Sequence, residues 1–323
     1  MRIAPVAHGK TDVGRQRGHN EDAFVAEQDL DLFVVCDGMG GNNAGEVASA
    51  LATTSLRNFF RATAHGVIPG EELRGDQALT EAARRLVMGV RKANADVFEI
   101  SSTRAEHKGM GSTIVAMSVS RETSSVQVAH VGDSRCYRIR DSKIEPLTRD
   151  HSLIGDALAW NPNLSEEELS MLPKNIISRA LGLKQVVEVD IRSDPGLPGD
   201  IYLLCSDGLC GVVKDKQILE IILLSSDLAE ACDSLIALAN DAGGPDNITA
   251  VAVRLDAAGV ITSSGPEIVI SVVGEDDIPP DAESSSFPAP NNNKRTGALC
   301  EKCGRRATGP EVYCGQCGAR IAL

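Results

Sequence analysis

Three aspartates stand at the edges of apolar runs, each beside a glycine or an asparagine. They are Asp37 in VVCDGMGG, Asp207 in LLCSDGLCG and Asp246 in GGPDNITAV. Each run predicts a core strand, and a carboxylate at its edge beside a small residue keeps its oxygens open to ligands. Hard divalent cations such as Mg²⁺ and Mn²⁺ take oxygen ligands, so these carboxylates would form a cation site if they converged. One such aspartate alone is typical of a turn or a helix cap. Three further carboxylates extend the set: Glu21, Asp22 and Asp133.

A loop that binds nucleotide phosphates is the competing interpretation of the segment after Asp37, because glycines there follow a strand and precede a helix. Gly38, Gly40 and Gly41 do not make the GxGxxG pattern, however, and no GK[ST] follows them. The two helices and the antiparallel strands expected downstream also lack a βαβ repeat. The sequence therefore favours a cation site.

A second cluster of metal-binding residues lies near the end of the chain, in two CxxC pairs that ten residues separate, each followed by a glycine. Four thiolates at this spacing can surround one tetrahedral ion, which we expect to be zinc, with rubredoxin-like iron as the alternative. So small a unit has little core, and the metal would supply most of its folding free energy. The sequence predicts a zinc ribbon over 299–323 with these ligands: Cys300, Cys303, Cys314 and Cys317. The other five cysteines lie in or beside apolar runs, and we expect buried thiols there: Cys36, Cys136, Cys205, Cys210 and Cys232.

Charge and hydropathy restrict the classes of protein. The chain has 323 residues, with 32 Lys and Arg against 45 Asp and Glu, a net charge of −13. This argues against an electrostatic footprint for nucleic acid or anionic lipid along the whole chain. The apolar stretches 201–205 and 218–224 are far shorter than the roughly 20 residues that span a bilayer. The first residues also lack the apolar segment of a secretory signal, so we expect a cytoplasmic protein that binds no membrane.

The elements that must position the carboxylates can be placed from apolar periodicity and turn residues. A folded unit is expected over 1–256, followed by a linker over 257–298 whose Ser, Pro, Asn and acidic residues cannot form a core. Inside the linker, 268–273 (IVISVV) is a β-prone patch that could dock or add a strand. The segment 153–175 is predicted to be irregular or partly helical. The expected helices are 44–64, 77–101, 214–224 and 228–241. The expected strands are 32–36, 113–119, 126–131, 134–140, 143–147, 201–205 and 248–255. Gly132 and Asp133 are expected to form a hairpin turn between the third and the fourth of these strands.

Eight short blocks rich in glycine and charged residues follow one another along the chain. They are RGHNED at 17–22, DGMGG at 37–41, GMGST at 109–113, VGDSR at 131–135, LTRDHS at 147–152, SRALG at 178–182, SDGL at 206–209 and GGPDNIT at 243–249. In this order they resemble the signature blocks of the metal-dependent protein phosphatases of the PP2C family, most closely its bacterial branch. The resemblance covers about residues 8–255. It implies an α+β fold, an α/β sandwich of two antiparallel sheets flanked by helix pairs, and hydrolysis of phosphoserine and phosphothreonine in proteins.

The resemblance also implies a role for each carboxylate. Asp37 resembles the ligand that bridges two Mn²⁺ or Mg²⁺ ions, with Glu21 and the Gly38 carbonyl around the second ion. Asp207 and Asp246 resemble ligands of the first ion. Asp133 would hold a third, looser ion together with Asp207, as bacterial members do.

Arg17 resembles the residue that clamps the phosphate, since a planar guanidinium can meet two phosphate oxygens at once. The proton donor to the leaving group is open, because Met39 stands where some relatives have a histidine. Asp22 and a water on the metal are the two candidates. His19 and His151 are expected to support local structure rather than to transfer protons.

Three functions remain open on the sequence. An active phosphatase, opposing a serine/threonine kinase, is favoured because no metal carboxylate is missing from the blocks. A catalytically silent scaffold that binds phosphoproteins on the same fold is the alternative. The segment 294–323 carries six basic and two acidic residues, a net charge of +4, and could dock a protein partner for which the phosphatase unit is a regulator. Nucleic acid is not expected there, since Tyr313 is its single aromatic residue.

Overall fold

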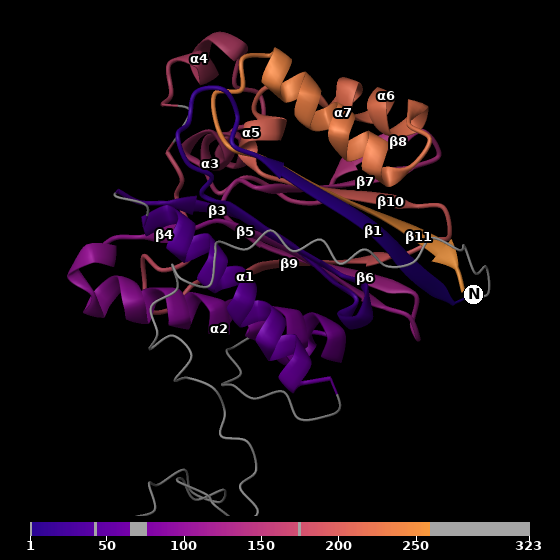
Figure 1. Cartoon of the computed structure of the whole chain (residues 1–323), viewed down its shortest axis with the longest axis horizontal. Coiled ribbons are helices and arrows are strands. Elements are labelled where there is room, and N and C mark those ends of the chain that lie inside the picture. The colour runs from indigo at the N-terminus through magenta and orange to yellow at the C-terminus, as the bar shows by residue number, and fades with distance from the viewer. Residues whose placement is uncertain (1, 42–43, 65–75, 174–175, 259–323) are drawn as a thin grey trace, which may run out of the picture. The chain divides into compact units, whose positions relative to one another are not determined.

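Two antiparallel β-sheets lie face to face, and a pair of helices covers the outer face of each sheet (Figure 1). The computed structural model describes residues 2–41, 44–64, 76–173 and 176–258. The predicted sandwich of two sheets between helix pairs is confirmed. The predicted linker, from residue 259 onward, and the predicted zinc ribbon lie outside the described residues, whereas position 257, its predicted first residue, is the last residue of the final strand. Among the described helices, none is both long enough and apolar enough to cross a membrane.

The first sheet has the strand order β1, β11, β10, β7, β8, and the second has the order β2, β3, β5, β6, β9, with β4 paired to β3. The strands of the first are β1 (Ile3–Asp12), β7 (Arg135–Arg140), β8 (Lys143–Pro146), β10 (Ile201–Cys205) and β11 (Ile248–Ala257). Those of the second are β2 (Asp22–Glu27), β3 (Leu32–Met39), β4 (Gly111–Ser112), β5 (Ile114–Ser120), β6 (Ser125–Val131) and β9 (Asp190–Pro195).

Helices α1 (Ala44–Ala62) and α2 (Glu81–Thr103) pack on the second sheet, while α6 (Asp215–Leu224) and α7 (Leu228–Asp241) pack on the first (Figure 1). Two short helices, α3 (Leu153–Trp160) and α4 (Glu166–Ser170), lie in the segment predicted to be partly helical, and α5 (Asp207–Cys210) follows β10 directly. Single 3₁₀ turns complete the set: η1 (Gln28–Leu30), η2 (Asp76–Ala78) and η3 (Ala105–His107).

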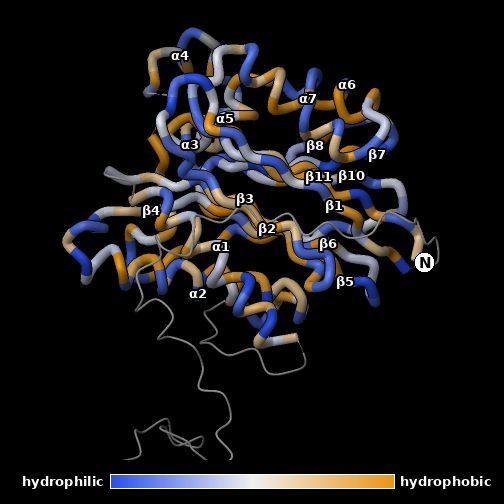
Figure 2. The backbone as a smooth tube through the Cα atoms, viewed as in Figure 1, coloured by the Kyte–Doolittle hydropathy of each residue, from blue (hydrophilic) through white to orange (hydrophobic). Residues whose placement is uncertain are grey.

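Strand β3 shows why the central strands read as unbroken apolar runs. Leu32, Val34 and Cys36 belong to the core under α1 and α2, whereas Phe33 and Val35 belong to the core between the two sheets. Successive side chains of a strand point to opposite faces, so a strand that is covered on both faces needs apolar residues throughout. The hydropathy colouring follows this arrangement, with hydrophobic residues along the inner strands (Figure 2).

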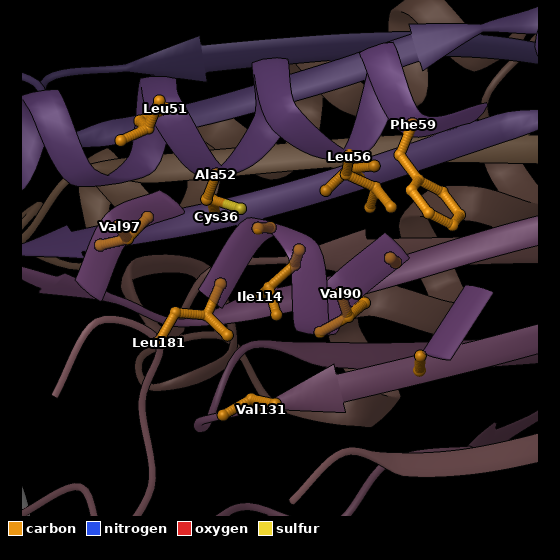
Figure 3. Close-up of a cluster of buried hydrophobic side chains, with 14 of the residues drawn as sticks. Cys36, Leu51, Ala52, Leu56, Phe59, Val90, Val97, Ile114, Val131 and Leu181 are labelled. Carbon is orange, nitrogen blue, oxygen red and sulfur yellow. The ribbon is translucent and has the colours of Figure 1, made fainter. Parts of the chain in front are cut away.

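The helix layer on the second sheet packs closely. Cys36, Leu56, Phe59 and Val90 line part of this core (Figure 3). A Cβ added at Gly89 of α2 would lie 2.5 Å from the Leu56 Cδ1 atom of α1. A larger residue at this position would require the Leu56 side chain to move.

One expected connection is wrong. Gly132 and Asp133 do not turn a hairpin, because β6 lies in the second sheet and β7 in the first. Gly132 has a φ of +111°, which lets the chain leave β6 and cross to the opposite sheet. The crossing takes Asp133 to the end of the sandwich where both sheets deliver carboxylates. Strands β1, β2, β4 and β9 were not predicted from the sequence.

Candidate active site

The predicted carboxylates converge at one end of the sandwich. Asp37 lies in β3 directly opposite Asp22, the first residue of β2, in the antiparallel ladder. Asp207 begins α5 at the end of β10, and its carboxylate lies close enough to that of Asp37 for each to shift the pKa of the other. Asp246 precedes β11 and lies close enough for its charge to act on Asp22, Asp37 and Asp207. Four carboxylates from both sheets therefore share one site.

Electrostatics at Asp37 show how crowded the site is. Burial raises the pKa of Asp37 well above its ordinary value, and the neighbouring carboxylates Asp22 and Asp207 raise it further. The backbone around it is fixed by Thr113, whose hydroxyl accepts a hydrogen bond from the Asp37 N–H at 3.0 Å, and whose own N–H donates to the Asp37 carbonyl at 2.8 Å. Asp37 is thus held in place by its main chain, which leaves its side chain for ligands.

Asp22 is the most enclosed member of the group, with 4% of its surface exposed. Its Oδ2 accepts hydrogen bonds from the hydroxyls of Ser206 at 2.7 Å and Thr249 at 2.6 Å. Its Oδ1 is buried and has no hydrogen-bond partner among the described residues. Burial raises the pKa of Asp22 to about 7, although the two hydroxyls lower it. Asp22 can therefore hold or release a proton near neutral pH.

Asp133 reaches the site from the crossing between the sheets. A Cβ on the preceding Gly132 would lie 2.6 Å from the Thr113 Cβ, so the chain approaches this threonine closely. Within the described part of the chain, Oδ1 of Asp133 and Oδ1 of Asp207 are both buried without a partner. Burial, and then the charge of Asp207, raises the pKa of Asp133 to about 7. The two carboxylates therefore lie near each other.

Glu21 and Gly38 lie on the side of α1. The Gly38 N–H donates to the Glu21 carbonyl at 3.0 Å, and a Cβ on Gly38 would lie 2.0 Å from the Gly45 carbonyl oxygen. The Glu21 carboxyl group lies against Gly45, because a Cβ there would be 2.9 Å from its Oε1. Burial raises the pKa of Glu21, while Arg17 lowers it. Gly45 therefore leaves room for the Glu21 carboxylate, and Gly38 leaves room for the backbone beside it.

Arg17 stands at the rim of the carboxylate group. It is about half exposed, and its Nη2 donates to Oδ2 of Asp246 at 2.6 Å. Asn247 secures the loop that carries it: Nδ2 donates to the Val13 and His19 carbonyls, and Oδ1 accepts from the Glu21 N–H at 2.8 Å. The loop therefore presents an exposed guanidinium next to the site.

The group fits divalent cations. Like charges gathered in a buried place are unfavourable unless cations compensate them, and carboxylate oxygens are the ligands that Mg²⁺ and Mn²⁺ prefer. The buried oxygens without partners among the described residues, on Asp133 and Asp207, are atoms that such ions would use. When bound, a pair of these ions supplies a water that ionises near neutral pH.

Four residues with a clear role in the site were not singled out from the sequence. Thr113, Ser206, Asn247 and Thr249 hold the backbone and the side chains of the acidic residues. Each lies inside one of the eight blocks, so the blocks contain the signal. Which atom each hydroxyl or amide meets depends on the pairing of strands from the two sheets.

Another group of potential ligands, His130, His151 and Asp190, lies within metal-binding spacing of one another. Arg179 already supplies a cation there, since its Nη1 donates to Oδ1 of Asp190 at 2.5 Å and lies 3.2 Å from Nε2 of His151. The group is a hydrogen-bonded part of the framework. His151 takes part in the hydrogen bonds of this framework.

Comparison with known proteins agrees with this geometry. Residues 14–239 match the sequence profile of the family described as protein phosphatase 2C. The serine/threonine phosphatase stp of Listeria monocytogenes is 36% identical over 253 residues, which are 77% of this chain and 96% of that protein.

Solved structures match over a similar range. The crystal structure of the Mycobacterium tuberculosis serine/threonine phosphatase PstP/Ppp superposes with a TM-score of 0.67 at 32% identity, over 79% of this chain and 100% of that one. A structure of the PstP catalytic domain in complex with two manganese ions matches with a TM-score of 0.66 at 31% identity, over the same shares. With acidic residues from both sheets meeting at one end of this sandwich, the chain belongs to the protein phosphatase 2C family and is a metal-dependent serine/threonine phosphatase.

Proposed function

We propose that two Mn²⁺ or Mg²⁺ ions occupy the carboxylate site, with Asp37 between them. Glu21 and the Gly38 carbonyl would complete one ion, and Asp207 with Asp246 the other. Asp133 and Asp207 would hold a third, weaker ion. The observation that carries this assignment is the convergence of buried acidic groups that raise one another's pKa values, with buried oxygens left without partners in the described part of the chain.

In this proposal Arg17 binds the phosphate group. Its guanidinium can meet two phosphate oxygens, and it can stabilise charge on them as the phosphorus–oxygen bond breaks. Arg17 is exposed at the rim of the site and is paired with Asp246. A cation at Asp246 would compete for that carboxylate and leave the guanidinium to the phosphate.

Asp22 would take part in proton transfer from its buried position beside the other carboxylates. Because its Oδ1 is closed to solvent, Asp22 would not touch a protein substrate directly. Fixed by Ser206 and Thr249, it would hold a proton on Oδ1 and exchange it with water between the carboxylates. By this route Asp22 would supply the proton for the leaving oxygen through water.

Phosphate release from a phosphothreonine peptide tests the assignment. We would measure it with Mn²⁺, with Mg²⁺ and with a chelator, for the wild type and Asp37→Asn. Turnover should require an added ion and fall on the order of a hundredfold or more in the variant. A folded wild type that binds the phosphopeptide but shows no turnover with either ion would instead favour the silent scaffold.

For the rest of the chain we propose a linker over 257–298 and a zinc ribbon over 299–323, after a phosphatase domain over 1–256. Two CxxCG units support the ribbon. Zinc content of the purified chain should be about one ion and should be lost when Cys300 is replaced by serine. Deleting 296–323 should leave turnover of a short peptide unchanged, and it should weaken binding of a protein partner if the basic ribbon is a docking module.

We further propose a cytoplasmic enzyme that opposes a serine/threonine kinase, by acting on the kinase or on its targets. Free thiols at all five described cysteines suit a reducing compartment. Incubating the phosphatase with a phosphorylated kinase from the same cell and following loss of phosphate would test the pairing.

A further inference from the structure

The loop that carries Asp133 is held by a histidine from a distant part of the sequence. His151 is buried, with 1% of its side chain exposed. Its backbone N–H donates to the Gly132 carbonyl at 2.9 Å, and the Gly132 N–H donates back to the ring nitrogen Nδ1 at 3.1 Å. Two reciprocal hydrogen bonds therefore join His151 to the residue just before Asp133.

The ring of His151 is itself fixed from three directions. Because Nδ1 accepts a hydrogen bond, the proton of the neutral ring lies on Nε2. Nε2 faces Oδ2 of Asp190 at 3.3 Å, and Asp190 is held in turn by Arg179. The ring of His130 stacks on it with 4.5 Å between centroids. Nδ1 is thus presented at a set position.

The loop that carries Asp133 also contacts Thr113, the residue whose hydrogen bonds fix the Asp37 backbone. Gly132 packs against the Thr113 side chain, and the Thr113 hydroxyl is hydrogen-bonded to Ser134 Oγ at 2.7 Å. The loop is therefore held by contacts with Thr113 and by hydrogen bonds with His151. His151 also closes the base of the segment that holds α3 and α4, since its carbonyl accepts from the Ser178 N–H at 2.9 Å.

The position of the Asp133 carboxylate has to be restrained by its backbone. Its buried Oδ1 has no partner among residues that the structure describes, and the neighbouring Asp207 repels it. A carboxylate under this repulsion would move away unless its main chain resisted.

We propose that His151 is a positioning residue for the metal site: through Nδ1 it holds the Gly132 amide and so keeps the Asp133 carboxylate beside Asp207 for an outer divalent ion. The inference rests on the assignment of Asp133 as a ligand in the proposed function. Residues that orient metal ligands typically contribute about 10-fold to 100-fold in metal affinity.

Two substitutions separate this role from simple support of the fold. His151→Asn keeps a side-chain acceptor near the position of Nδ1, whereas His151→Gln places its amide near the position of Nε2 and leaves the Gly132 N–H without its partner. Asp133→Asn is the reference for loss of the outer ion. Mn²⁺ binding to the full chain is measured by calorimetry, with folding checked by circular dichroism.

The wild type should bind an outer ion that Asp133→Asn loses. His151→Gln should weaken that ion about tenfold or more and leave the tighter ions unchanged, while His151→Asn should stay within about threefold of the wild type. Outer-ion affinity in folded His151→Gln equal to the wild type overturns the inference, and so does an equal loss in both variants.

Two further results keep the test decisive. Should His151→Gln fail to fold, Asp190→Ala releases Nε2 from the sheet edge, and it must weaken the outer ion about threefold or more. Unchanged binding in Asp190→Ala overturns the inference. If Asp133→Asn binds as many ions as the wild type, the assignment of Asp133 fails, and the role of His151 fails with it.

Discussion

Replacing Asp133 with asparagine should stabilise the metal-free protein, even though it removes a proposed ligand. Burial and the charge of Asp207 raise the pKa of Asp133 from 3.8 to about 7. One pH unit corresponds to about 1.4 kcal/mol, so ionised Asp133 destabilises the metal-free fold on the order of 4 kcal/mol. An asparagine amide in the same place still loses hydration. We therefore expect the free energy of unfolding of Asp133→Asn to exceed that of the wild type by about 2 kcal/mol. This difference corresponds to a rise in Tm of about 4–8 °C for a domain of this size.

The pH dependence gives the sign of the effect. Below about pH 4, Asp133 is protonated in both the folded and the unfolded chain, so its ionisation does not lower the free energy of unfolding. Between about pH 4 and pH 7 the unfolded chain releases the proton while the folded chain retains it. The stability contributed by Asp133 therefore falls as pH rises through this window. The advantage of Asp133→Asn should be absent at acidic pH and full above about pH 7.

Thermal unfolding in a chelating buffer, followed by circular dichroism about one pH unit above and three below the pKa near 7, measures this difference. Asp241→Asn is the matched control, because Asp241 is exposed at the end of α7 and its replacement should change stability by less than about 0.5 kcal/mol. Added Mn²⁺ should reverse the order, since it stabilises the wild type more than Asp133→Asn. A lower Tm for Asp133→Asn than for the wild type without metal would refute the reasoning.

Three other outcomes are expected. Arg17→Lys should lower kcat/KM for a phosphothreonine peptide about 10-fold to 100-fold without loss of Mn²⁺ affinity in calorimetry, because an ammonium meets phosphate oxygens singly; an unchanged kcat/KM would exclude Arg17 as the clamp. Asp22→Asn should remove an ionisation near pH 7 from the pH profile of kcat/KM, and a profile that keeps it assigns that ionisation elsewhere. Gly132→Ala should lower the free energy of unfolding in urea by about 2–4 kcal/mol, through its φ of +111° and the contact with Thr113. Gly243→Ala, with a φ of +112° and open space for a Cβ, should cost only about 1–2 kcal/mol, and equal losses would show that the contact is unimportant.

Strands covered on both faces were predictable. Of the strands at the sheet edges, β8 was predicted as 143–147, whereas β1, β2 and β9 were missed. The apolar run 32–36 became part of β3 because both faces of that strand are buried. Strand β9 reads DIRSDP, and it pairs along one side only, with β6. Backbone hydrogen bonds hold this strand in the sheet, and they depend little on the type of side chain. Strand β1 is also at an edge, and its half-buried residues alternate too weakly to be recognised.

The carboxylates themselves were apparent from the sequence, because a polar residue at the edge of an apolar run is a local feature. Asp37, Asp207 and Asp246 needed only their neighbours in the chain to be singled out. Their environment was not apparent. That Oδ2 of Asp22 accepts from Ser206 and Thr249 follows from strands of different sheets coming together.

The sequence by itself determined the reaction class, the candidate ligands and most of the central strands and helices, since these depend on residue types and short-range periodicity. Only the tertiary structure decided that the chain crosses between sheets at Gly132, and that His151 meets it there. A tight turn and a crossing have the same local residues, and the choice depends on which strands pair with the two segments. The pKa values near 7 were decided in the same way, because burial and the distances between charges exist only once both sheets are in place.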